Sequence, residues 1–489
     1  MSRFIMIMCM AMGFLICHAQ DIKKNQREFD DFRSEMYKDF ESFRAEIMRE
    51  YIVFVKNPWK EFESAPPVPK PKVEPVPPVV WPEEDKDTTC INDNPILIND
   101  VINPNPIVPQ PQPIEKIPEK DNSDESYLEL SFYGTPLKVR YLNSKDYQIG
   151  KISEKNVANA LTILATDKYD NSIIDCLNVR KEYRLCDWAY LQFIQQVSNQ
   201  ACGKSSNEAT LFAAYLLMQS GYKIRMAYSG DRLYLLYASN HCIYDRSPYM
   251  IDGEFYYGLA ELPSKLYISK ASFPKEQNIS LQIIEQPVFS VDMSSKRTVS
   301  SKAFPIFRID IQTNKNLLSF YETYPCSYYD DNYMTQWSQY ANAPMDPQIV
   351  KDVYPNFKKL LHGLSEKERV DILLNWVQTG FKYEYDDKVW GRDRIFFSEE
   401  SLFYPFCDCE DRSILFTRLV RDLVGLDCVL LYYPGHLASA VNFTIPVRGD
   451  YVELGGKRYV VCDPTFIGAP VGVTMPEMNN SKAGVIRLN

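Results

Sequence analysis

The C-terminal part of the sequence predicts an α+β fold, because one amphipathic helix is followed by several short strands. Apolar residues recur at helical spacing over Ile414–Val424, directly after a run of acidic residues. Alternating apolar segments follow at Leu426–Tyr432 and after Gly435, and a third one ends at Cys462. Such short, alternating segments are typical of strands with one buried face.

Three residues at the ends of these elements form a candidate catalytic triad. Cys409 precedes the helix, His436 stands where a turn passes into a strand, and Asp463 follows the next strand. A thiol at a helix N-terminus gains from the partial positive charge there, which lowers its pKa. A histidine can take the thiol proton, and a carboxylate fixes the imidazole tautomer. The pattern predicts Cys409 as nucleophile, His436 as base and Asp463 as the residue that orients it.

Two other features bear on this site. Cys407 competes for the role of nucleophile, but it lies two residues further from the helix and would gain less from its field. An oxyanion needs hydrogen-bond donors, and the backbone N–H of Cys409 is one. The indole of Trp390 and the amide of Gln378 are candidates for the second, and the sequence does not choose between them.

The acidic residues beside the nucleophile have two interpretations. Asp408 and Glu410 suit the first turn of a helix, where carboxylates are favoured, and there Asp408 can act as the cap. They also oppose formation of a thiolate, which makes the histidine more necessary. The second interpretation is that both carboxylates bind Ca²⁺ beside the nucleophile, because hard cations take oxygen ligands. The chemistry itself requires no cofactor.

Three short motifs in this order resemble the core of the transglutaminase-like superfamily. They are Tyr-Pro-Phe-Cys-Asp-Cys-Glu-Asp-Arg-Ser-Ile-Leu, Gly-His-Leu-Ala-Ser-Ala-Val and Tyr-Val-Val-Cys-Asp-Pro-Thr, and the similarity covers roughly residues 365–470. The resemblance implies a papain-like core, with the nucleophile helix packed on an antiparallel sheet and Cys409, His436 and Asp463 as the triad. The Asp-Cys-Glu-Asp context is similar to bacterial transglutaminase-like cysteine proteinases, in which a calcium site lies by the nucleophile. Cys407-Asp408 departs from the Gly-Asp or Gly-Val of many members.

The N-terminus is typical of an exported protein. Residues 1–19 have the form of a signal peptide, with Arg3, an apolar stretch and a cleavage position after Ala19; lipidation of Cys17 is the alternative. The expected location is periplasmic, cell-surface or extracellular. No segment is long enough to span a membrane. The net charge of −10, without a basic stripe, argues against nucleic acid as a partner.

Two segments precede the globular sequence. Residues 20–63 predict an amphipathic helix, because an aromatic pattern repeats every 11 residues from Phe29 through Phe40 to Tyr51. This helix either packs on the protein's own body or mediates an oligomer or a partner contact. Residues 64–124 predict an extended Pro-rich linker, since 15 of the 32 prolines lie there.

The remaining chain divides into three parts: 125–300, a connector at 301–344, and the catalytic domain at 345–489. The first part is interpreted as a degenerate copy of the last, because aligning Gly221 with Gly425 superposes a helix and the strand after it. In that alignment the triad positions hold Ser205, Arg232 and, nearby, Ala260, so the copy lacks the chemistry.

These observations predict an exported thiol hydrolase that cleaves a peptide or amide bond of a protein or peptide substrate through an acyl-enzyme on Cys409. Two alternatives stay open. The acyl group can pass to an amine, giving a cross-linking acyltransferase, or the chain is a non-catalytic scaffold with a vestigial triad.

Overall fold

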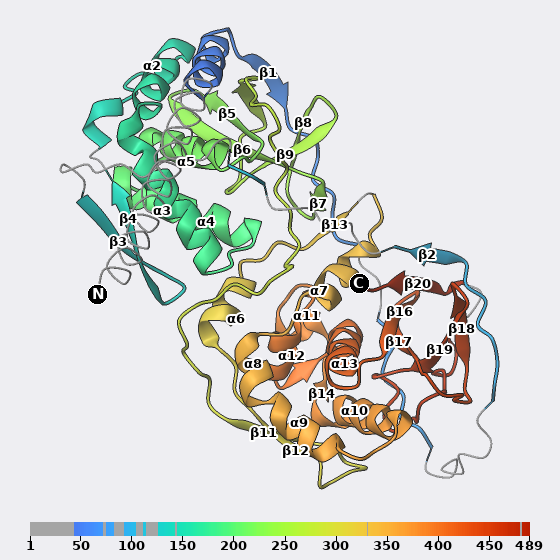
Figure 1. The fold of residues 1–489 in the computed structure, drawn as a ribbon. Helices are drawn as coiled ribbons and strands as arrows, with labels where there is room; N and C mark the ends of the chain where they lie inside the picture. The colour runs from blue at the N-terminus through green and yellow to red at the C-terminus, as the bar shows by residue number, and fades with distance from the viewer. Residues whose placement is uncertain are drawn as a thin grey trace, which may run out of the picture.

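The computed structural model describes residues 44–71, 75–82, 92–103, 111–113, 126–141, 144–329, 331–479 and 482–489. The described chain is a mixed α+β structure with two six-stranded, mainly antiparallel sheets, one in each of two lobes (Figure 1). The predicted signal peptide and the repeat before residue 44 lie outside the described residues. No helix among the described residues has the length and apolar character needed to cross a membrane.

The first lobe contains a helical layer and one sheet. Its helices are α2 (Glu154–Leu164), α3 (Asp170–Glu182), α4 (Asp187–Cys202) and α5 (Asn207–Gln219). Its strands are β1 (Lys60–Glu63), β3 (Ser126–Phe132), β4 (Thr135–Tyr141), β5 (Ile224–Ser229), β6 (Arg232–Ser239), β7 (His241–Ile243), β8 (Tyr249–Ile251), β9 (Glu254–Gly258) and β10 (Lys265–Ile268).

The second lobe places its helices on one side of a sheet. The helices are α6 (Lys315–Tyr321), α7 (Thr335–Asn342), α8 (Pro347–Asp352), α9 (Tyr354–Leu361), α10 (Glu366–Gly380), α11 (Asp386–Val389), α12 (Ser398–Phe403) and α13 (Cys409–Leu423). The strands are β2 (Asp100–Ile102), β11 (Arg297–Ser300), β12 (Arg308–Ile311), β13 (Ser327–Tyr329), β14 (Lys382–Tyr383), β15 (Phe406–Cys407), β16 (Asp427–Tyr433), β17 (His436–Asn442), β18 (Tyr451–Leu454), β19 (Lys457–Cys462) and β20 (Gly484–Arg487). The β13 strand pairs with β7 and thereby links the lobes.

The two main sheets share one strand order. The first is β1-β10-β5-β6-β9-β8, and the second, read from its opposite edge, is β2-β20-β16-β17-β19-β18. In each lobe a long helix, α5 or α13, precedes the two central strands. The edge strands differ, because β1 is antiparallel to its neighbour whereas β2 is parallel. This correspondence supports the hypothesis of a degenerate copy, which stays a prediction.

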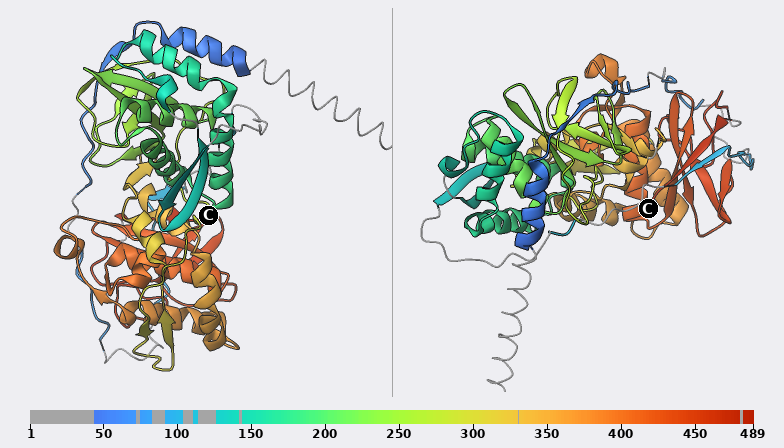
Figure 2. Two further views of the ribbon diagram at one scale, coloured as in Figure 1. Left: turned by 90° about the vertical axis from the view of Figure 1, so that its left-hand side faces the viewer. Right: turned by 90° about the horizontal axis from the view of Figure 1, so that it is seen from above.

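The described part of the repeat-bearing segment packs on the first lobe. Residues 44–55 are helical, and this helix lies along the top of the lobe in Figure 2. Tyr51 stacks on Phe273 with 4.2 Å between ring centroids, while Phe54, expected in the same stripe, is exposed. The predicted helix over 20–63 is too long at its end, because Lys60–Glu63 form β1.

The Pro-rich segment runs along both lobes. The segment begins directly after β1, an edge strand of the first sheet. Further along, Asp100–Ile102 form β2 at the edge of the second sheet. In Figure 2 the blue trace descends from the first lobe to the second. We call the described residues 64–71 and 75–82 of this segment the arm. Their contacts lie beside the candidate site.

The start of α10 shows how local sequence fixes an element of the second lobe. The hydroxyl of Ser365 accepts a hydrogen bond from the backbone N–H of Glu368, and the Glu368 carboxylate accepts one from the backbone N–H of Ser365. This capping box satisfies two N–H groups that a helix leaves unpaired.

We predict that Ser365→Ala lowers the free energy of unfolding by about 1 kcal/mol, as loss of an N-cap hydroxyl does. Chemical denaturation of the full chain measures the change. Ser365→Thr keeps a hydroxyl and serves as the matched control. Equal destabilisation by both substitutions would contradict the capping role.

Candidate active site

The fold brings Cys409, His436 and Asp463 to one end of the second lobe's sheet. Cys409 is the first residue of α13, His436 is the first residue of β17, and Asp463 directly follows β19. The Ser413 hydroxyl, one turn along α13 from the thiol, donates to the Leu437 carbonyl at 2.8 Å. The pairing of Ser439 with Cys462 then sets the two strands so that His436 and Asp463 meet.

His436 and Asp463 form a buried, hydrogen-bonded pair. Nε2 of His436 lies 2.8 Å from Oδ2 of Asp463, and the imidazole is 0% exposed. The other carboxylate oxygen accepts from the backbone N–H groups of Thr465 and Phe466. Nδ1 of His436 is buried and has no hydrogen-bond partner among the described residues. With its N–H directed at the carboxylate, a neutral imidazole keeps the lone pair on Nδ1 available to accept a proton.

A second layer of polar contacts holds Asp463. The amide nitrogen of Gln378 donates to the carbonyls of Asp463 and Ala469, both at 3.0 Å, and its amide oxygen accepts from Gly468. The buried guanidinium of Arg412 donates to the carbonyls of Gln378, Phe381 and Pro464. Sequence reasoning missed Arg412, although its position three residues after Cys409 on the helix placed it near the site.

The thiol of Cys409 lies in a buried, acidic setting. It is 4% exposed and donates to Oε2 of Glu410 at 3.1 Å. Burial raises its pKa well above 9.0, and the carboxylates of Glu410 and Asp408 raise it further. The backbone N–H of Leu437, the residue after His436, acts in the opposite direction and lowers the pKa. Burial and the acids therefore outweigh the field of the helix.

Lys70 of the arm supplies a positive charge to this acidic cluster. Its Nζ forms an ion pair with Asp393 at 2.7 Å. Burial lowers the pKa of the Lys70 ammonium, but the neighbouring Cys326, Asp393 and Glu410 raise it, and the net direction is upward. The same ammonium lowers the pKa of Glu410, against the effect of burial.

The predicted calcium site stays a prediction, although the structure brings three possible ligands together. Asp408, Cys409 and Glu410 place one ligand atom each within 4.8 Å of one another, and Asp408 Oδ1 is buried without a hydrogen-bond partner among the described residues. These three ligand atoms are two carboxylate oxygens and one sulfur, whereas Ca²⁺ takes six to eight oxygen ligands. Lys70 already provides the positive charge in this place. No step of the chemistry below is therefore assigned to a metal.

The two predicted oxyanion donors lie in different settings. Both N–H bonds of the Gln378 amide are used to hold the Asp463 turn, so this amide acts as a positioning group. Trp390 belongs to an aromatic cluster with Tyr404 and Phe396, at centroid distances of 4.7 and 5.7 Å.

Tyr383 is a third candidate donor, which sequence reasoning missed. It pairs with Cys407 across β14 and β15, and its hydroxyl is buried without a hydrogen-bond partner among the described residues. Burial raises the pKa of Tyr383, and the adjacent Cys409 raises it further. Both effects favour the protonated hydroxyl, which can donate a hydrogen bond. In the sequence, a single tyrosine in a short strand gives no indication of this role.

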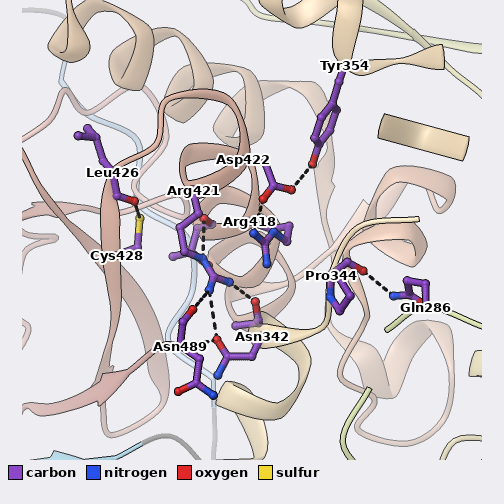
Figure 3. Close-up of polar contacts among 12 residues, drawn as sticks. Gln286, Asn342, Pro344, Tyr354, Arg418, Arg421, Asp422, Leu426, Cys428 and Asn489 are labelled. Carbon is purple, nitrogen blue, oxygen red and sulfur yellow. Dashed lines mark hydrogen bonds and ion pairs between the residues drawn. The ribbon is translucent and has the colours of Figure 1, made fainter. Parts of the chain in front are cut away.

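Three further cysteines of this lobe, Cys407, Cys428 and Cys462, are core thiols. Cys407 is buried, and burial raises its pKa to about 11, although Arg412 opposes the shift. Cys428 donates to the Leu426 carbonyl at the far end of α13, and burial raises its pKa to about 12 (Figure 3). Cys462 is also buried. All of these thiols are free, as is Cys409.

The far end of α13 is fixed by a polar network, drawn in Figure 3. Arg421 donates to the side chain of Asn342 on α7 at 3.1 Å and to the carbonyl of Asn489 at 2.9 Å. Asp422 accepts from the Tyr354 hydroxyl at 2.7 Å and pairs with Arg418. The nucleophile helix is thus held at both ends.

The corresponding positions of the first lobe lack this chemistry. Arg232 begins β6 as His436 begins β17, and each follows a turn of the same length. The strand pairings place Ala260 where Asp463 lies in the second lobe. Ser205 lies two residues before α5 starts, in a left-handed conformation with φ of 58°.

No family model, curated protein or solved structure matches this chain.

We predict that the acidic cluster makes the protein less stable as the pH rises. Burial raises the pKa of Asp408 and Asp411 well above 3.8, and that of Asp386 to about 8. Carboxyls of this kind stabilise the fold fully below their ordinary pKa, and the contribution is lost as the pH rises through the folded value. In the Asp408→Asn variant, the free energy of unfolding should fall less steeply as the pH rises. The slope should differ by up to about 1.4 kcal/mol per pH unit.

Urea denaturation between pH 4 and pH 8 (roughly the span from the ordinary to the raised pKa) measures this slope. The exposed Asp387 provides the control substitution Asp387→Asn. Identical slopes for the two variants would show that Asp408 does not carry a raised pKa.

Proposed function

We propose that this protein is an exported thiol hydrolase of the transglutaminase-like kind, with Cys409, His436 and Asp463 as its triad. The observation that carries the proposal is the buried pair of His436 and Asp463, whose free Nδ1 lies at the start of β17, beside the first turn of α13. No structural need explains a buried imidazole with one unsatisfied nitrogen, since such a group costs free energy without a partner.

The reaction follows from these positions. His436 Nδ1 takes the proton from the Cys409 thiol, and Sγ forms a bond to the carbonyl carbon of a peptide or amide. The tetrahedral intermediate collapses as the C–N bond breaks, and His436 returns the proton to the leaving amine. Water then attacks the thioester carbonyl as His436 takes one of its protons. The C–S bond breaks and His436 returns the proton to the sulfur, which releases the acid and the free thiol.

Charge developing on the carbonyl oxygen needs donors that are already in place. The backbone N–H of Cys409 and the hydroxyl of Tyr383 fit this role, and Trp390 is the alternative to Tyr383. Asp463 orients the imidazole, while Gln378 and Arg412 position Asp463 and the start of the helix.

The substrate in this proposal is a protein or peptide met in the periplasm, at the cell surface or outside the cell. The papain-like core and the degenerate copy at 125–300 belong to the same proposal, supported by the order of helix and strands and by the shared sheet order. An amine that reached the thioester before water would make the enzyme a cross-linking acyltransferase.

A non-catalytic scaffold is the second candidate, and one observation favours it. All three triad side chains are buried beneath other parts of the chain. A vestigial triad can remain as a packed hydrogen-bonded unit. The two candidates differ in the reactivity of the thiol.

We predict that a peptide-based thiol electrophile labels Cys409 in the full chain faster than Cys428 or Cys462. His436→Ala should slow the labelling of Cys409 at pH 7 by about 100-fold or more, the contribution typical of a general base. Asp463→Asn should slow it less, because the base remains but its tautomer is no longer fixed. Peptide mapping by mass spectrometry measures each rate.

His241 provides the matched control, because it is also a buried histidine, in the first lobe. His241→Ala should leave the labelling of Cys409 within a factor of about two, as expected for a side chain distant from the reacting atoms. If Cys409 reacted no faster than Cys428, or if its rate did not depend on His436, the enzyme proposal would fail and the scaffold would stand.

A further inference from the structure

The arm makes its first set of contacts on the first lobe and then extends to the acidic residues beside Cys409. The Ala65 N–H donates to the Pro248 carbonyl, and the Val68 carbonyl accepts from Asp245, so this part is held on the first lobe. Lys70 then extends to Asp393 and to the neighbourhood of Glu410, the residue that binds the Cys409 thiol. The arm thus places its ammonium group within the acidic surroundings of the nucleophile.

The second set of contacts lies on the histidine and aspartate side. The Val76 N–H donates to the carbonyl of Gly435, which directly precedes His436, at 2.8 Å. Further along, the Trp81 N–H donates to the Ile467 carbonyl at 2.9 Å, and the Ile467 N–H donates to the Val79 carbonyl at 2.8 Å. These contacts begin next to His436 and end four residues after Asp463.

The side chains of this part fill an apolar site on the second lobe. Trp81 packs on Phe466 with 5.3 Å between ring centroids. Val76 and Val79 pack with Trp81 against the small core formed by Phe466, Ala469 and Met475. In contrast, the side chain of Val80 points away and is 65% exposed.

This arrangement is the one by which proteins bind extended peptides. Main-chain hydrogen bonds hold the strand, and alternate side chains enter apolar sites and give selectivity. Proline-rich residues lose little conformational entropy on binding, because they are already extended. The segment is part of the same polypeptide, so its binding is intramolecular.

We propose that the arm occupies the substrate groove of this protein as a built-in competitor. The groove takes an extended polypeptide with aliphatic residues and an aromatic residue at the Val76, Val79 and Trp81 positions, and the arm must leave before a substrate reaches Cys409. The inference rests on the proposed function, since a groove for substrate presupposes an enzyme.

The test compares arm variants of the full chain by two measurements. Trp81→Ala and Lys70→Met each remove one anchor, and Val80→Ala changes the exposed neighbour as the matched control. Hydrogen exchange at the Ile467 amide reports whether the arm is bound. The rate of Cys409 alkylation by iodoacetamide reports whether the thiol is accessible.

We expect Trp81→Ala and Lys70→Met to increase both exchange at Ile467 and alkylation of Cys409 by about tenfold or more, since each shifts an opening equilibrium. Val80→Ala should match the unchanged chain. A synthetic peptide of residues 75–82, Pro-Val-Pro-Pro-Val-Val-Trp-Pro, should slow alkylation of the Trp81→Ala variant again. The same peptide with alanine at the tryptophan position should not.

Three results separate the inference from the proposed function. Exchange that rises at Ile467 without faster alkylation of Cys409 would overturn the inference, because the released arm would then not cover the thiol. Unchanged exchange in both variants would also overturn it, because these contacts would not hold the arm. Faster alkylation that is insensitive to His436→Ala in the Trp81→Ala background would leave the arm as a cover and refute the enzyme.

Discussion

The buried guanidinium of Arg412 is the contact on which the candidate site depends. It extends from α13 and donates to three carbonyls, those of Gln378 and Phe381 at the end of α10 and that of Pro464 beside Asp463. These carbonyls satisfy both terminal nitrogens of a charged group that has no exposure to water, while Nε has no hydrogen-bond partner among the described residues. One side chain therefore ties the helix of the nucleophile to the turn that carries the carboxylate.

The thiol shows a balance of opposing electrostatic effects. A helix N-terminus favours the thiolate by a fraction of an elementary charge, whereas burial and two adjacent carboxylates disfavour it. The sequence indicates the helix field and the adjacent acids, whereas the burial of the thiol depends on the tertiary fold. Lys70 partly offsets the acids, and it comes from a segment more than 300 residues away in sequence.

Local sequence patterns were sufficient to predict helices and strands, but not the contacts between residues far apart in the sequence. Helical spacing of apolar residues located α13, and alternation located β16 and β17, because both patterns depend on neighbours within a few residues. Lys60–Glu63 were wrongly assigned to a helix, since pairing with β10 overrides a helical pattern. Gln378 was predicted as an oxyanion donor from its type alone, while its partners near Asp463 lie 85 and 91 residues away. Tyr383 and Arg412 have no local signature for the same reason.

The covering of the site is a consequence of how the N-terminal segment is anchored. Residues 60–63 are an edge strand of the first sheet, and residues 100–102 are an edge strand of the second. The arm between them cannot diffuse away, so its concentration at the groove is set by the length of the chain and not by the solution. A free peptide of equal affinity would rarely displace it. Opening therefore requires a change at the anchors, such as cleavage of the arm or separation of an edge strand, or a substrate with additional contacts elsewhere on the protein. Because the two lobes share one sheet order, each has such an edge strand, and the candidate triad lies in the second lobe.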